Sequence, residues 1–145
     1  MTTSTWKKQP ATDEWNTADS WVPAGVPTEQ AAFTASSQTA ISFTASGEAR
    51  VANIEFDDSA PAYSFTFGPS ATPALTITGR GVANRSGKQQ SFVIAATSSG
   101  YPDPQLKFIN AASAGGDDLF YCAGPEPDRL WRNQRWLCRT HPVLR

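Results

Sequence analysis

The chain alternates apolar and polar residues with a period of two over much of the region between residues 39 and 108. Alternation in which the apolar members are β-branched or aromatic is typical of strands with one buried face. The alternating segments are 41–44, 54–56, 65–67, 75–78 and 106–108, and residues 91–95 form a more continuous apolar run. Turn-forming glycine, proline, serine and aspartate separate them, and residues 35–118 show no sustained helical period. We therefore predict an all-β fold.

The spacing of these segments favours a parallel β-helix. The predicted strands are short, and hairpin dipeptides such as Asn-Gly are missing from the turns between them. Ile41 and Phe65 are 24 residues apart, and Ile54 and Leu75 are 21 apart, which is about one solenoid coil. Residues 35–118 would form about three to four coils, with a small core. A β-sandwich is the alternative, because its strands recur about every 8–12 residues.

The first 34 residues are rich in tryptophan and contain Trp6, Trp15 and Trp21. The pairs Val22-Pro23 and Val26-Pro27 disfavour a helix, because proline lacks an amide hydrogen and restricts the residue before it. One hypothesis is an aromatic cap that covers the open end of the β-helix. The other is a carbohydrate-stacking surface formed by the three tryptophans. No cluster of acidic and amide side chains accompanies them in the sequence, which favours the cap.

Composition divides the chain into two unlike parts. The net charge of −1 combines 7 basic and 11 acidic residues before residue 119 with 5 basic and 2 acidic residues after it. Residues 1–118 contain 14 serines and 14 threonines, whereas residues 119–145 contain no serine and only Thr140. We divide the chain into a cap segment (1–34), β-helix coils (35–118) and an atypical tail (119–145). The near-neutral total gives no global field that would attract nucleic acid or an acidic membrane.

The tail admits three interpretations. A shifted reading frame near residues 118–120 would explain its composition, because favourable codons for residues 130–138 read in another frame give a further F-G-G-T-S-V-G-S-A repeat. Cys122, Cys138 and His141 could ligate a metal, although structural zinc sites usually have four ligands in paired spacings. A short amphipathic helix over residues 129–138 could instead cover the last coil, and this C-terminal cap is the structure we expect. A disulfide between the two cysteines stays open.

Targeting signals are missing from the sequence as given. Lys7 and Lys8 are followed by polar residues rather than by the apolar run of a signal peptide. No window approaches the roughly 18 apolar residues of a membrane-spanning helix. We therefore expect the chain to remain in the cytoplasm as given, with no membrane insertion.

Groups suited to catalysis are scattered. The pairs Asp57-Asp58 and Asp117-Asp118 lie among turn residues, where aspartate commonly hydrogen-bonds its own backbone, so we interpret them as solvated turns. Arg50, Arg80 and Arg85 are isolated among serine and glycine, without an evident partner. Gly79-Arg80-Gly81 lacks the remainder of a dinucleotide-binding motif, and aromatics do not alternate with basic residues as on a nucleic-acid surface. We expect no catalytic residues, no cofactor, no bound metal and no nucleic-acid partner.

Several motifs in one order resemble bacterial repetitive surface proteins. The opening W-N-T-A-D-S-W at residues 15–21, V-P at 26–27 and A-A-F at 31–33 is similar to the start of autotransporter-like passengers, where Gln30 stands in place of an acidic residue. Later pieces follow in the order of that family: residues 54–56, 75–79, 81–87, 90–92 and the F-I-N-A-A-S-A-G segment at 108–115. The resemblance covers about residues 10–118.

The resemblance implies the first coils of a right-handed parallel β-helix, in proteins that are exported as adhesin-like passengers. On that basis we expect a non-catalytic fragment of a cell-surface repeat protein, with relatives at the cell surface or secreted. The alternative is a carbohydrate-binding or carbohydrate-active β-helix remnant. Self-association through an open β-helix end, or an unidentified glycan or surface ligand, would be the partner.

Overall fold

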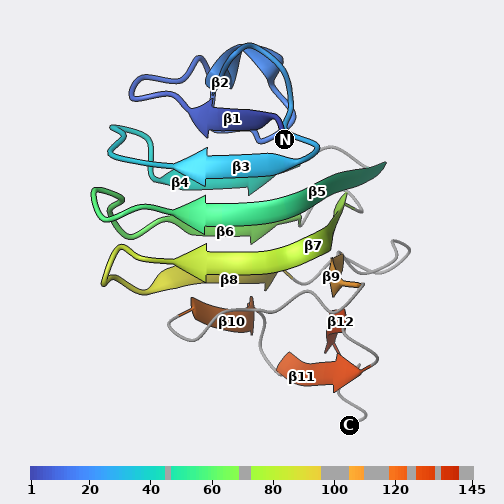
Figure 1. Ribbon diagram of the computed structural model, residues 1–145. Coiled ribbons are helices and arrows are strands. Elements are labelled where there is room, and N and C mark those ends of the chain that lie inside the picture. Colours follow the sequence, from blue (N-terminus) through green and yellow to red (C-terminus); the bar gives the residue numbers. More distant parts are fainter. Residues whose placement is uncertain are drawn as a thin grey trace, which may run out of the picture.

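The computed structural model describes residues 1–44, 47–68, 73–95, 105–109, 118–123, 127–132 and 135–140, the last three stretches by their backbone pairing (Figure 1). Twelve strands and one 3₁₀ turn, Ala18–Ser20, are present in these residues. The strands are β1 (Thr3–Trp6), β2 (Trp21–Val22), β3 (Gln30–Phe33), β4 (Ala40–Phe43), β5 (Gly47–Phe56), β6 (Ser64–Phe67), β7 (Pro73–Asn84), β8 (Gln90–Ala95), β9 (Gln105–Phe108), β10 (Asp118–Ala123), β11 (Pro127–Arg132) and β12 (Arg135–Thr140).

Two sheets form the walls of a solenoid of about three turns. The larger sheet has the order β11-β12-β9-β7-β5-β3-β1-β2, and the smaller has the order β10-β8-β6-β4. The chain passes from one sheet to the other and back, so that β3, β5, β7 and β9 pair in parallel, as do β4, β6, β8 and β10 (Figure 1). The predicted all-β parallel β-helix is confirmed, and the sandwich alternative is not the fold.

The register between coils agrees with part of the predicted spacing. Ile41 lies opposite Phe65, as expected from their 24-residue separation. The 21 residues between Ile54 and Leu75 do not measure one coil, because Ile54 lies opposite Val82 and Leu75 lies opposite Ala49. The strand lengths were also underestimated, since β5 has 10 residues and β7 has 12. Both strands extend because each has a parallel partner along much of its length.

A change of register between β5 and β7 shapes the larger sheet. Val51 lies opposite Ile77, whereas Asn53 lies opposite Gly81, so β7 carries two additional residues at this point. Gly79 fits there because a Cβ atom would lie 2.7 Å from the Ala52 carbonyl oxygen and 2.7 Å from Asn53 Oδ1. Gly81 has φ +104°, a conformation that favours glycine. The close approach at Gly79 and the positive φ of Gly81 therefore account for both glycines. A dinucleotide-binding role is not needed to explain them.

Stacked aromatic side chains fill the space between the sheets. Phe43 stacks on Phe67 at 4.3 Å between ring centroids, and Phe65 stacks on Phe92 at 4.7 Å. Each pair comes from neighbouring coils of the smaller sheet, because parallel register places equivalent residues on top of one another. Burial of each phenyl ring contributes roughly 1.5–3 kcal/mol, and each ring pair about 0.5–1.5 kcal/mol more. The aromatic stack therefore stabilises the core between the two sheets.

The three N-terminal tryptophans continue this stack and close its end. Trp6, Trp15 and Trp21 are each at most 1% exposed, and Trp21 packs edge-on against both of the others at about 5 Å. The Trp6 indole donates a hydrogen bond to the Gln38 carbonyl, and the Trp21 indole donates one to the Trp15 carbonyl. Among the described residues, the Trp15 indole nitrogen has no hydrogen-bond partner. The cap thus pairs two of its three indole nitrogens while its rings cover the first coil.

The same segment covers the exposed edge of the smaller sheet at β4. Ser42 donates its backbone amide to the Asp13 carbonyl, and Trp15 donates its amide to the Ser42 carbonyl. The Glu14 carboxylate accepts hydrogen bonds from the Thr44 amide and hydroxyl. An edge strand whose backbone groups are paired in this way no longer offers a template for another chain.

The predicted helix over residues 129–138 is wrong. Pro127–Arg132 and Arg135–Thr140 form an antiparallel pair, and β12 adds antiparallel to β9 at the end of the larger sheet. Strand pairing satisfies the backbone groups along the open edge of β9, which a helix cannot do. The sequence signal was the mirrored order L-W-R then R-W-L, which places Trp131 opposite Trp136. The C-terminal segment therefore joins the last coil through strand pairing, and its role as a cap stays a prediction.

Candidate functional site

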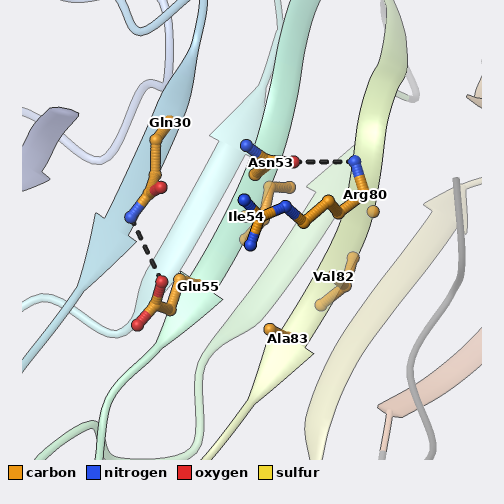
Figure 2. Close-up of a pocket in the computed structure, with 8 residues that line it drawn as sticks. Gln30, Asn53, Ile54, Glu55, Arg80, Val82 and Ala83 are labelled. Atoms are coloured by element: carbon orange, nitrogen blue, oxygen red, sulfur yellow. Dashed lines mark hydrogen bonds between the residues drawn. The ribbon is translucent and has the colours of Figure 1, made fainter. Parts of the chain in front are cut away.

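The outward face of the larger sheet contains a shallow hollow where β3, β5 and β7 lie side by side (Figure 2). Along the register, Gln30 lies opposite Asn53, which lies opposite Gly81. Two steps along the strands, Ala32 lies opposite Glu55, which lies opposite Ala83. Because glycine and alanine occupy the positions on β7, the larger side chains of β3 and β5 border an opening of about 80 Å³.

Glu55 lies in the middle of the hollow, and two neighbouring side chains interact with its carboxylate. The Gln30 side-chain amide donates a hydrogen bond to Glu55 Oε2 at 3.2 Å (Figure 2). The Arg85 guanidinium forms an ion pair with Glu55 Oε1. The Glu55 side chain is 28% exposed, so these partners lie at the boundary between the sheet and solvent. Its negative charge is therefore already balanced within the protein.

Asn53 lies at the border of the hollow, next to the change of register between β5 and β7. Its Oδ1 accepts a hydrogen bond of 2.7 Å from the backbone amide of Arg80 (Figure 2). Its Nδ2 makes only a weak contact, 3.6 Å, with the sulfur of Met1. The amide therefore holds β7 in place through its oxygen and retains donor capacity on its nitrogen.

Arg80 supplies the free charge at this site. Its side chain is exposed and reaches from β7 across β5, toward Asn53 and Ile54 (Figure 2). In the part of the chain that the structure describes, the Arg80 guanidinium has no ion pair. The hollow therefore combines one uncompensated cation with amide and carboxylate groups that already support one another.

The other two arginines have partners, which corrects the expectation that none of the three does. Arg50 lies 3.5 Å from Glu48 Oε1, and Arg85 pairs with Glu55. A hydrogen bond from the Thr76 hydroxyl lowers the pKa of Glu48, and the charges of Arg50 and Lys107 lower it further. Among Arg50, Arg80 and Arg85, Arg80 is the one without an ion pair to a described residue.

A second hollow, of about 260 Å³, lies at the turn after β5 beside Asp57, Asp58 and Arg85. Asp57 Oδ1 accepts hydrogen bonds from the Ser59 amide at 2.9 Å and from the Ser59 hydroxyl at 2.6 Å. For Asp57 this is the predicted local turn bonding, and it commits Asp57 Oδ1 to Ser59. Asp117 and the side chain of Asp118 lie outside the described residues.

The three tryptophans proposed for carbohydrate stacking lie in the interior. Trp6, Trp15 and Trp21 have their ring faces covered by one another and by Phe33 and Phe43. A sugar ring would have to displace packed aromatic side chains to reach any of them. Their burial argues against stacking on a ligand and favours the cap.

The sequence did not single out Gln30, Asn53 and Glu55 as site residues. Gln30 is more than twenty residues away from the other two along the chain, and only the parallel register brings it beside them. The signal available in the sequence was that these three residues occupy outward positions of the alternation, since Ala31 and Ile54 beside them point into the core. Arg80 was noted in the sequence, but its neighbours depend on the register change that Gly79 and Gly81 permit.

The side chains on which the metal hypothesis for the tail depends lie outside the described part of the chain. The backbone of Cys122 lies in β10 and that of Cys138 in β12, while their side chains and His141 lie outside the description. In the remaining described residues no group of three or more histidine, cysteine, aspartate or glutamate side chains is placed to hold a metal ion.

Comparisons of the chain with protein-family models, with curated proteins and with solved structures give no match. The described residues contain no helix with the length and apolar character needed to cross a membrane.

Proposed function

We propose that this chain is a non-catalytic segment of an adhesin-like β-helix repeat protein that acts at a bacterial cell surface. The observation that carries the proposal is the stack of parallel strands, in which β3, β5, β7 and β9 repeat one wall coil after coil. This is the architecture that the resemblance to autotransporter-like passengers implies. A solenoid of this kind extends by adding coils and displays its outward side chains along a continuous face.

The pKa directions of Glu29 and Glu48 support a role without catalysis for these two groups. Hydrolysis of glycosides requires a carboxyl group whose pKa is raised so that it can donate a proton. Hydrogen bonds from Thr2 lower the pKa of Glu29, and the Thr76 hydroxyl lowers that of Glu48. Both glutamates are therefore held ionised, as partners of neighbouring groups rather than as acids.

Protease treatment of intact cells of the source organism tests the surface location. If the proposal holds, peptides from residues 1–145 appear in the supernatant of intact cells while a cytoplasmic marker protein stays inside. Recovery of these peptides only after lysis would contradict it. A parallel digest of lysed cells is the control that the peptides are detectable.

Carbohydrate binding is the second candidate function, and the hollow around Arg80 favours it. The site offers a free cation next to amide groups on an outward face, which suits a polar ligand that is rich in hydroxyls. An oligosaccharide array, incubated with the chain and then analysed for cleaved products, separates the alternatives. Retention without cleavage fits binding by a non-catalytic surface protein, whereas cleavage would assign the chain to the carbohydrate-active class.

A further inference from the structure

We infer that the hollow on β3, β5 and β7 binds the carboxylate of an acidic saccharide, with Arg80 as its anion-binding residue. The inference deepens the second candidate function, on which it rests, by naming the residues and the ligand class. It does not depend on where the protein is located, so its test is separate from protease treatment of cells.

The charge of the hollow favours an anionic ligand. The carboxylate within the hollow, Glu55, already has Arg85 as its ion-pair partner, so the pair is neutral. Arg80 adds one positive charge that no ion pair in the described part of the chain offsets. A guanidinium presents planar donor pairs that match the two oxygens of a carboxylate.

The polar neighbours select a ligand that carries hydroxyl groups beside its carboxylate. Gln30 uses its amide nitrogen on Glu55, which leaves its side-chain oxygen as an acceptor at the border of the hollow. Asn53 uses its oxygen on the Arg80 backbone and keeps amide hydrogens for donation. Adjacent donors and acceptors of this kind match the alternating donor and acceptor capacity of sugar hydroxyls.

The shape of the site favours a group on an extended chain over an enclosed small molecule. The opening of about 80 Å³ is several times the roughly 10–15 Å³ that a single water needs, so it has room for a substituent of a ligand. Gly81 and Ala83 line it on β7 without large side chains, so a ligand can lie along the sheet and place one substituent in the hollow. A saccharide that carries a carboxylate on its ring meets these requirements.

The test uses an array of uronate- and sialate-containing oligosaccharides, each paired with its carboxyl-reduced neutral counterpart. The full chain is compared with the variants Arg80→Gln and Arg50→Gln. Arg50 is the matched control, because it is an exposed arginine of the same sheet but is paired with Glu48. A third variant, Ala83→Phe, fills the hollow from an exposed position without entering the core.

The expected result is binding of at least one acidic oligosaccharide, with affinity reduced about tenfold or more by carboxyl reduction, by Arg80→Gln and by Ala83→Phe. Arg50→Gln should retain at least half of the affinity, and added salt should weaken binding. Unchanged melting temperatures show that the variants are folded.

Three results would overturn the inference. The first is that no acidic oligosaccharide on the array binds. The second is equal loss in the Arg80 and Arg50 variants, which would indicate attraction by general charge. The third is binding of sodium acetate with the same affinity as the oligosaccharide, which would show that the site binds a carboxylate without recognising the sugar.

Discussion

At the scale of single residues, glycine decides where the register of the larger sheet changes. Gly79 lies against the backbone of Ala52 so closely that any side chain would overlap it. The amide of the next residue, Arg80, then reaches Asn53 Oδ1 at 2.7 Å. One residue without a side chain therefore sets both the packing of β5 on β7 and the position of the free arginine.

Substitution of Gly79 by alanine should lower the free energy of unfolding by about 1–3 kcal/mol, because the added methyl group forces β5 and β7 apart. Urea denaturation measures the change. Gly87→Asn is the control, since Gly87 has φ +69°, where asparagine is tolerated, and no atom within 4 Å of an added Cβ. Equal stability of Gly79→Ala and the unmodified chain would contradict the close approach.

Tyr63 makes stability depend on pH in the alkaline range. Burial raises the pKa of its hydroxyl to about 12, and the hydroxyl donates a hydrogen bond to the Thr34 carbonyl. The folded state therefore favours the neutral phenol, and an unfolded tyrosine has a pKa near 10. Its contribution is fully present below pH 10 and is lost as the pH rises from about 10 to 12.

Urea denaturation at a series of pH values from 8 to about 12 tests this prediction. The unmodified chain should lose stability more steeply above pH 10 than Tyr63→Phe. The variant itself should be less stable at neutral pH by about 1 kcal/mol, because it loses one hydrogen bond. The same alkaline slope in both proteins would show that Tyr63 is not the group responsible.

At the scale of elements, the sequence predicted the positions of the strands better than the pairing between them. The segments at 54–56, 65–67, 75–78 and 106–108 lie within strands, and the segment at 41–44 does so up to Phe43, because alternation reports directly which side chains face the core. The extension of β5 back to residue 47 and of β7 to residue 84 was missed. Glycine and arginine in these parts interrupt the alternation, and only pairing with the neighbouring coil holds them extended.

The candidate site was harder to predict than the strands for the same reason. Periodicity indicated that Glu55 faces outward, but it assigned the residue that follows it in the next coil incorrectly. The offset between paired residues of β5 and β7 is 26 rather than 21 before Gly79, since Val51 lies opposite Ile77, and two additional residues around Gly79 raise it to 28. No local pattern reports either difference. The C-terminal hairpin was missed because its strands pair antiparallel, outside the coil repeat.

The hairpin of β11 and β12 should protect the last coil from association. Deletion of residues 124–145 removes it and exposes the edge of β9, whose partner on that side is β12. We expect a lower melting temperature, by several degrees, and elution from size-exclusion chromatography at a larger apparent mass. Deletion of residues 141–145 alone is the matched control. Unchanged melting and elution after the longer deletion would contradict the capping role.

At the scale of the whole molecule, a cap, a stack of coils and a closing hairpin follow one another along the solenoid. The N-terminal tryptophans pack on Phe33 and Phe43, and these rings pack in turn on Phe56, Phe65 and Phe67. The core thus joins the cap to the coils through hydrophobic residues. The proposed saccharide site is such an outward feature, and it exists only in the observed register.

The register between β5 and β7 is therefore the central claim, and disulfide trapping tests it most directly. In a background with Cys122 and Cys138 replaced by serine, Glu55→Cys with Ala83→Cys places two thiols on directly opposite positions. Strands lie about 4.8 Å apart, which suits a disulfide. The register of a uniform 21-residue coil would instead place Thr76 opposite Glu55, so Glu55→Cys with Thr76→Cys is the comparison.

Mild oxidation followed by mass spectrometry should show an intramolecular disulfide in most of the protein that carries Glu55→Cys and Ala83→Cys. The protein that carries Glu55→Cys and Thr76→Cys should show little or none. In the observed structure Thr76 lies opposite Arg50, five positions before Glu55 on β5, which is about 17 Å at 3.3 Å per residue. Preferential formation of the second disulfide would contradict the register, and with it the hollow on which the proposed site depends.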